Sequence, residues 1–138
     1  MTFIDSNVLV YFTDCRNQTK QAVARTVLAD AIGNPQYVIS AQVLNEFVNV
    51  ALKKLAMSED EVRQYVEAFQ HIRIALQQTC WTVRALEIRK RYGLQFYDSL
   101  LLAAAESAGC DEFLSEDLSD GQTYCGIKVV NPFSASYF

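Results

Sequence analysis

Four acidic residues occupy positions in which a carboxylate can do chemistry. Asp5 directly follows a short apolar run, and Asp117 stands just beyond another. Glu46 and Asp98 lie in two segments with helical periodicity. Hard cations such as Mg²⁺ and Mn²⁺ prefer oxygen ligands, and several carboxylates around one cleft need a metal to offset their repulsion. If the four converge, they predict a metal site that binds a phosphodiester and activates water.

Each acid also has an ordinary structural explanation. Asp98 fits an N-cap or a first-turn acid, and Asp117 and Asp120 fit turn residues ahead of a glycine. Glu46 lies about 200° around its helix from the apolar Leu44, which favours a solvated face. The first acid is harder to explain in this way, because it directly follows a strand at the edge where such sheets bind ligands.

The elements that must position these acids alternate along the chain. Short runs rich in β-branched and aromatic residues predict strands at 2–4, 37–39, 113–114 and 127–130. Helical patterns cover about 18–32, 41–55, 58–70, 82–92 and 98–108, and residues 71–80 show no clear period. Ser40 and Ser58 are expected to cap helices at their N-termini. Alternating strands and helices indicate a parallel sheet covered on both faces, with ligands at the carboxyl ends of its strands.

Length and composition indicate an ordinary globular domain. The chain has 138 residues, a net charge of −4 and 51% apolar residues, enough for one core. No apolar run reaches the roughly 18 residues that span a bilayer, and the first five residues lack the basic region of a signal peptide. We therefore expect a cytoplasmic protein with no membrane segment. The four cysteines form no CxxC pair, so they predict small apolar side chains rather than a zinc site.

Charge is unevenly distributed. Residues 1–97 carry 11 basic and 9 acidic groups, whereas residues 98–138 carry 1 basic and 7 acidic groups. This balance disfavours duplex binding by bulk charge, yet a local basic face can still hold a phosphate backbone. The candidates for such an RNA-binding face are Arg84, Arg89, Lys90 and Arg91, with Lys53 and Lys54 elsewhere. The alternative is a solvated helix face on which Arg84, Glu87 and Arg91 pair with one another.

Four segments, each containing one of the acids, resemble a known family when they are taken together. They are Phe3-Ile4-Asp5-Ser6-Asn7-Val8-Leu9, the segment from Ser40 to Phe47, Tyr92-Gly93-Leu94-Gln95-Phe96-Tyr97-Asp98-Ser99-Leu100-Leu101 and Leu114-Ser115-Glu116-Asp117-Leu118. The sequence resembles the PIN-domain family, and in particular the VapC-type toxin ribonucleases. The resemblance covers about residues 3–133, and the segments 121–124 and 129–133 are similar to the tail of one bacterial subgroup.

The resemblance implies a fold, an activity and partners. The implied fold is a three-layer α/β/α sandwich around a mainly parallel sheet of four or five strands, with a single domain spanning 1–138. The implied activity is a Mg²⁺- or Mn²⁺-dependent endoribonuclease, usually the toxin half of a toxin–antitoxin pair. We therefore expect an RNA substrate, a cognate antitoxin and a homodimer.

The resemblance also assigns roles to individual residues. Asp5, Glu46, Asp98 and Asp117 match the acidic quartet that binds metal and carries catalysis. Asn7 matches the polar residue that orients the first acid, and Ser115 matches the hydroxyl two places before the last. Glu116 is a further carboxylate beside Asp117, although β alternation would point it away from its neighbour.

Three other functions compete with the ribonuclease. A catalytically silent PIN-like RNA-binding scaffold keeps the same segments without the chemistry. A haloacid-dehalogenase-type phosphohydrolase needs a second Asp two places after Asp5, where this chain has Asn7. A response-regulator receiver needs a lysine after its fifth strand, whereas Lys128 lies inside a strand run.

Overall fold

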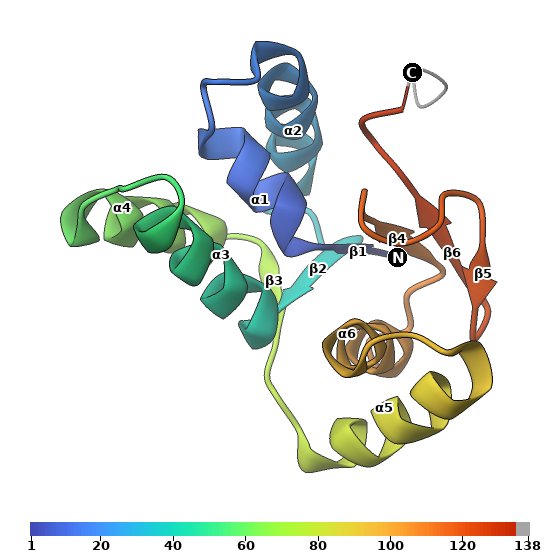
Figure 1. The fold of residues 1–138 in the computed structure, drawn as a ribbon. Helices are drawn as coiled ribbons and strands as arrows, with labels where there is room; N and C mark the ends of the chain where they lie inside the picture. The colour runs from blue at the N-terminus through green and yellow to red at the C-terminus, as the bar shows by residue number, and fades with distance from the viewer. Residues whose placement is uncertain (135–138) are drawn as a thin grey trace.

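A mainly parallel sheet of six strands crosses the middle of the protein, shown as a computed structural model in Figure 1. The structure describes residues 1–134. The strands are β1 (Thr2–Ile4), β2 (Tyr37–Ser40), β3 (Arg73–Ala75), β4 (Glu112–Leu114), β5 (Thr123–Tyr124) and β6 (Ile127–Val130). Their spatial order is β3-β2-β1-β4-β6-β5, and within the described residues only β5 is antiparallel to its neighbour.

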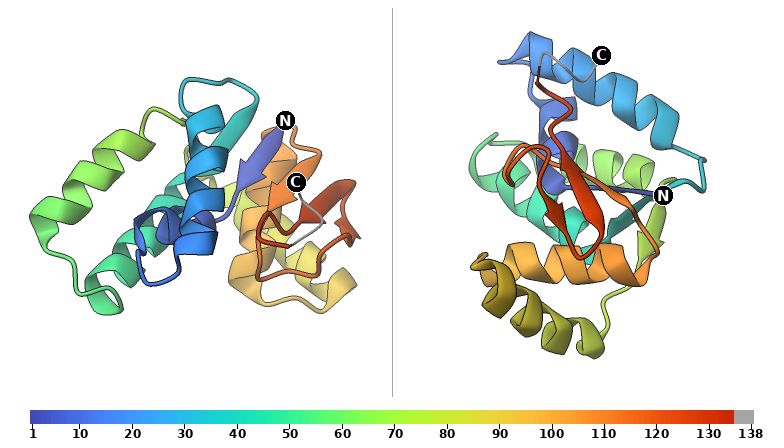
Figure 2. Two further views of the ribbon diagram at one scale, coloured as in Figure 1. Left: turned by 90° about the horizontal axis from the view of Figure 1, so that it is seen from above. Right: turned by 90° about the vertical axis from the view of Figure 1, so that its right-hand side faces the viewer.

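Six helices within residues 1–134 complete the layers. They are α1 (Ser6–Thr13), α2 (Gln18–Ala31), α3 (Ala41–Lys53), α4 (Glu59–Phe69), α5 (Thr79–Tyr92) and α6 (Phe96–Ser107). The helices α1 and α2 lie on one side of the sheet, and α5 and α6 lie on the other (Figures 1 and 2). The helix α3 packs against both α1 and α4. The predicted three-layer α/β/α architecture is confirmed.

The sheet has more strands than the four or five that were expected. All four predicted runs form strands, and β3 and β5 are additional. β3 is a three-residue edge strand with an exposed Arg73, so it shows neither a buried apolar run nor alternation. β5 has two residues and is held by a hairpin to β6, which is too short to produce a sequence pattern.

The helix α1 was not predicted, because its sequence is typical of a strand. Apart from its first two residues it is rich in β-branched and aromatic side chains, which have low intrinsic helix propensity. Asp5 nevertheless caps it, accepting a hydrogen bond from the Ser6 backbone N–H at its side-chain oxygen. Val8 and Leu9 are fully buried, so tertiary packing outweighs local propensity here.

The helices that were predicted begin and end at recognisable signals. Ser40 accepts a hydrogen bond from the Val43 backbone N–H, and Ser58 forms a reciprocal capping box with Glu61. Gly93 ends α5 at a φ of +70°, which a residue without a Cβ adopts at little cost. These caps fix where α3, α4 and α5 start or stop.

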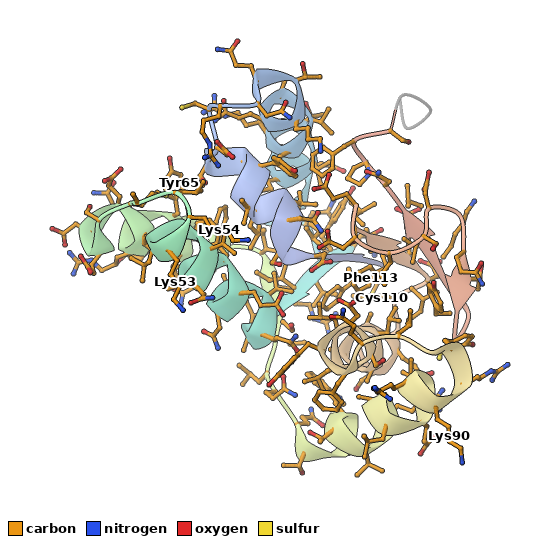
Figure 3. The ribbon with its side chains drawn as sticks, in the orientation of Figure 1. Lys53, Lys54, Tyr65, Lys90, Cys110 and Phe113 are labelled. Carbon is orange, nitrogen blue, oxygen red and sulfur yellow. The ribbon has the colours of Figure 1, made fainter. Side chains whose placement is uncertain are left out.

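Aromatic side chains fill the space between the sheet and the helices. The rings of Phe3 and Phe113 on neighbouring strands stack at 5.1 Å, and Phe113 is labelled with the buried Cys110 in Figure 3. Phe47 and Phe69 meet edge-on and tie α3 to α4. Fully burying one such side chain contributes about 1.5–3 kcal/mol, which gives the short strands a rigid setting. Within residues 1–134 no helix has the length and apolar character needed to cross a membrane.

Four chain segments reach the same edge of the sheet. The carboxyl ends of the parallel strands β1, β2 and β4 lie there, so the residues after each strand become neighbours. The helix α3 begins directly after β2, and α6, which leads back into β4, begins near this edge. The chain places β2 and β3 on one side of β1 and β4 on the other, so the β1–β4 boundary is a topological switch point.

Candidate active site

Asp5 is the buried centre of a group of four carboxylates. We call Asp5, Glu46, Asp98 and Asp117 together the acidic cluster. Only 3% of Asp5 is exposed, and its Oδ1 accepts the Ser6 backbone N–H at 2.7 Å. Its Oδ2 accepts the Ser115 hydroxyl at 2.7 Å. Because Asp5 also caps α1, its side chain is fixed at the β1–β4 switch point.

Asn7 and Ser115 connect Asp5 to Asp117. The Asn7 Nδ2 lies 3.3 Å from Asp5 Oδ2, 3.1 Å from Ser115 Oγ and 3.2 Å from Asp117 Oδ2. The buried Ser115 hydroxyl in turn accepts the Asp117 backbone N–H at 3.0 Å. The two residues therefore lie where an orienting role would require them. The Asn7 Oδ1 is buried and, within residues 1–134, has no hydrogen-bond partner.

Glu46 is held in place by two donors rather than facing solvent freely. The Ser6 hydroxyl lies 2.9 Å from Glu46 Oε2 and 3.4 Å from Asp5 Oδ1, so it bridges two members of the acidic cluster. The Gln42 Nε2 lies 2.6 Å from Glu46 Oε1. For Glu46 itself the interpretation as a merely solvated residue is wrong, because it contacts Ser6 of α1 and its neighbour Gln42 contacts the Tyr97 backbone of α6.

The sequence did not reveal Ser6 and Gln42 as holders of Glu46. Gln42 does stand four residues before Glu46, the spacing at which helical side chains meet, and that signal was available. Ser6 follows Asp5 directly, but its contact with α3 spans 40 residues and depends on how the helices pack.

Asp98 approaches from the opposite side of the sheet edge. It is the third residue of α6, whose N-cap is Gln95, so the N-cap interpretation of Asp98 is wrong. Its position in the first turn of the helix still favours a negative charge. The half-buried Asp98 and the exposed Asp117 line one cavity of about 490 Å³, together with Gly93, Gln95, Ser119 and Tyr124.

The four carboxylates affect one another electrostatically. The pKa of Asp5 is raised to about 7, chiefly by burial and also by the charges of Glu46 and Asp117, which together outweigh the lowering effect of the Ser115 and Ser6 hydrogen bonds. Burial also raises the pKa of Asp98, with Asp117 and then Glu46 adding to the shift. Within residues 1–134 no ion pair involves any of the four. The acidic cluster thus carries uncompensated negative charge.

The donors of the acidic cluster fit a hard divalent cation in type and charge. Every side-chain donor at the site is an oxygen or an amide, and the buried Asn7 Oδ1 adds a further unpartnered oxygen. As the side chains stand, no group of three or more His, Cys, Asp or Glu residues in the described chain forms a ready metal site. The chemistry of a metal site is therefore present without a closed coordination shell.

Glu116 points away from the acidic cluster into an ion pair. Its Oε2 lies 2.7 Å from Lys20 Nζ, and its Oε1 accepts the Tyr11 hydroxyl at 2.6 Å. The hydrogen bond to Glu116 raises the pKa of Lys20, whose ammonium lies 4.6 Å from the centre of the Tyr11 ring. Asp120 accepts the Asn131 backbone N–H and is a turn residue. Both acids have structural partners, and neither joins the cluster.

The predicted basic face divides into two parts. Arg84 donates two hydrogen bonds to Glu106 of α6, at 2.8 and 2.9 Å, and one to Glu87 at 2.8 Å. Arg89, Lys90 and Arg91 are exposed, and no ion pair within residues 1–134 involves them. Its pairing with two acids of the chain favours a structural role for Arg84, and its predicted RNA contact stays a prediction. Figure 3 shows Lys90 on α5 well separated from Lys53, the last residue of α3, and from Lys54, which follows it.

Comparisons with known proteins identify chains that are similar to this one. The PIN domain model matches residues 2–119, and no curated protein matches the chain. A toxin–antitoxin complex from Klebsiella pneumoniae has a TM-score of 0.70 at 22% identity, covering 96% of this chain and 98% of that chain. VapC20 from Mycobacterium tuberculosis, a sarcin-ricin loop cleaving toxin, has a TM-score of 0.63 at 16% identity, covering 82% and 87%. VapBC2 from Rickettsia felis, bound to a promoter DNA fragment, has a TM-score of 0.67 at 14% identity, covering 93% and 96%.

Proposed function

The chain belongs to the PIN-domain family, and from that premise we propose that it is a Mg²⁺- or Mn²⁺-dependent endoribonuclease. One observation carries the proposal: Asp5, Glu46, Asp98 and Asp117 come together at the β1–β4 switch point with no basic partner in the described chain. Such a surplus of charge is stabilised by a bound cation. Family membership also removes the phosphohydrolase and receiver alternatives.

We assign the members of the acidic cluster to two roles, metal binding and orientation of the attacking water. Asp5, Asp98 and Asp117 would hold the cation, and Glu46 would complete its shell or orient the attacking water. When bound, the cation holds the phosphodiester, activates water and stabilises the leaving oxygen. Glu46 suits the orienting role, because Ser6 and Gln42 each hold one of its oxygens in a fixed direction.

The hydrolysis that we propose is an in-line displacement at phosphorus. The oxygen of water forms a new bond to phosphorus and gives up one proton to the solvent, while the bond to the 3′ oxygen of the preceding ribose breaks. The 3′ oxygen takes up a proton, so the products carry 5′-phosphate and 3′-hydroxyl ends. Asn7 and Ser115 keep Asp5 and Asp117 oriented throughout.

We further propose that the protein is the toxin of a toxin–antitoxin pair. The Klebsiella pneumoniae structure is a toxin–antitoxin complex and the Mycobacterium tuberculosis protein is a toxin, and the fold that this chain shares with them supports this role. The proposal includes a cytoplasmic location, a single domain over residues 1–138, a homodimer and a cognate antitoxin. A small upstream gene for a DNA-binding protein with a flexible tail would support it strongly. Residues 135–138 of the proposed domain lie outside the described part.

Cleavage of defined RNA tests the proposal. The purified protein is incubated with 5′-labelled RNA in Mg²⁺, in Mn²⁺ and in EDTA, and the product ends are identified. We expect cleavage only with metal, 5′-phosphate at the new ends and no cleavage by the Asp5→Asn variant. RNA that binds but stays intact in both metals would support the silent scaffold instead.

A further inference from the structure

A cavity beside Glu46 is not used by the proposed chemistry. It has a volume of about 530 Å³ and lies between α3, the start of α6 and the segment before α5. Glu46 lines one side of it, so the cavity is continuous with the acidic cluster. A volume of this size is typical of pockets that bind small organic groups.

The lining of the cavity combines carboxamides with one aromatic ring. The Asn45, Asn49 and Gln77 side chains line it, and none of them makes a hydrogen bond within residues 1–134. Leu100 and Ala41 supply apolar surface. No basic residue of the described chain lines it and its wall is mainly apolar, so it is unsuited to a phosphate group and suited to a flat, neutral group whose edge can reach carboxamides.

Tyr97 is the aromatic residue of this cavity. The residue is 67% exposed although it directly precedes Asp98. Phe96 packs against its ring at 5.4 Å in an edge-on arrangement, and Gln42 donates to its backbone oxygen at 3.3 Å. These contacts from α6 and α3 hold an open aromatic face beside the carboxamides.

We propose that this cavity binds one RNA base next to the scissile phosphate. The base stacks on Tyr97, and Asn45, Asn49 and Gln77 read its edge, because a carboxamide offers a donor and an acceptor side by side. Single-stranded RNA is recognised in this way, through unstacked bases laid on aromatic rings. This inference rests on the proposed ribonuclease function and makes Tyr97 a specificity-determining residue.

Fluorescence of a base analogue tests the cavity separately from cleavage. Heptameric RNAs carrying a single 2-aminopurine at each position in turn are titrated with protein in EDTA, where no cleavage is expected. Stacking quenches 2-aminopurine, so we expect strong quenching at one position with the natural protein and with Tyr97→Phe. The Tyr97→Ala variant should lose that quenching and bind about ten-fold more weakly, since it lacks the ring.

Two controls separate a base from the RNA backbone and from other surfaces. An abasic heptamer at the quenched position should bind natural protein and Tyr97→Ala equally. Val83→Ala, at a residue of α5 that is 61% exposed and outside the cavity, should bind as the natural protein does.

The outcomes distinguish failure of the cavity from failure of the function. RNA that is cleaved, yet shows no position-dependent quenching and no change in Tyr97→Ala, overturns the base site alone. Protein that neither binds nor cleaves RNA overturns both proposals. If Tyr97→Ala leaves RNA binding intact and weakens binding of a purified antitoxin, the cavity receives a peptide and the base site is overturned.

Discussion

Two groups of carboxylates in this protein have opposite electrostatic settings. In the acidic cluster, burial and mutual repulsion raise the pKa of Asp5 and Asp98, and no ion pair within residues 1–134 relieves them. Between α5 and α6, Arg84 compensates Glu87 and Glu106, and hydrogen bonds to them raise the pKa of the guanidinium. The ion pairs of Arg84 hold α5 and α6 together, whereas the carboxylates of the acidic cluster repel one another.

The difference shows how a structural carboxylate is distinguished from a functional one. A carboxylate that serves the fold has its partner on the chain, as Glu106 and Glu116 do. A buried carboxylate without a cationic partner destabilises the protein even when it accepts hydrogen bonds, so it requires a reason outside the chain. The divalent cation that we propose would provide that reason for the acidic cluster.

The largest expected effect separates the two groups by activity. Asp5→Asn should lower the rate of RNA cleavage in Mg²⁺ by orders of magnitude, because an amide is a poor ligand for a hard cation. Glu106→Gln removes a carboxylate of the paired group and should leave the rate close to that of the natural protein. Initial rates on one labelled RNA measure both. Equal losses in the two variants would contradict the distinction.

The second expected effect is on stability as a function of pH without metal. The pKa of Asp5 is about 7 in the folded protein and near its ordinary value of 3.8 when unfolded, so the native state binds more protons between these values. The free energy of unfolding should therefore fall as pH rises from about 4 to 8, by on the order of 3 kcal/mol. Denaturant unfolding in EDTA across that range measures the slope.

The Asp5→Asn variant provides the comparison for this slope. It can still cap α1, because Asn and Asp are similar N-caps, and it has no charge to lose. Its stability should be flatter with pH and should exceed that of the natural protein at pH 8. A slope as steep as that of the natural protein would assign the pH dependence to other groups.

A third, intermediate effect concerns metal and melting temperature. A cation that binds only the native state stabilises it by about 2.7 kcal/mol at a hundred times its Kd. Asp98→Asn should melt at or above the natural protein in EDTA, because the N-cap of α6 is Gln95 and no cap is lost. The variant should lose most of the gain produced by Mn²⁺, while Glu87→Gln keeps it. Thermal melts with and without Mn²⁺ decide whether Asp98 belongs to the metal site.

The smallest expected effects divide the basic residues of α5. Arg84→Gln should lower the free energy of unfolding by about 1 kcal/mol and leave the salt dependence of RNA binding unchanged. Replacing Arg89, Lys90 and Arg91 together by Gln should leave stability nearly unchanged and reduce the salt slope by about 0.7 for each lost phosphate contact. Binding titrations at several salt concentrations test this division, and an unchanged slope would make the three a solvated face.

Helices and strands could be predicted from the sequence wherever burial of one face gives their apolar residues a regular spacing. The stripe on α3 and the capping box before α4 predicted those helices, because one face of each must meet the core. The helix α1 did not follow from the sequence, since its β-branched and aromatic residues favour a strand locally. Its helical form depends on the cap that Asp5 provides and on burial of Val8 and Leu9.

The sequence could propose the four acids and their polar neighbours Asn7 and Ser115, whose role in catalysis stays a prediction, but it could not propose the contacts that hold Glu46. Asp5, Glu46, Asp98 and Asp117 were identified from their order and context in the PIN-like segments. The bridge from Ser6 to Glu46 and the pairing of Arg84 with Glu106 join residues that are 40 and 22 positions apart. Such contacts are set by how helices pack, and one sequence holds no local pattern for them.

The double use of Asp5 has a consequence for how this protein can change over generations. A single substitution of Asp5 to asparagine would keep the cap of α1 and remove a buried charge. Loss of catalysis would then be accompanied by a higher free energy of unfolding. Selection for activity must therefore act continuously against a drift toward inactive descendants. Lineages released from that selection should accumulate asparagine at position 5 before they accumulate damage in the core.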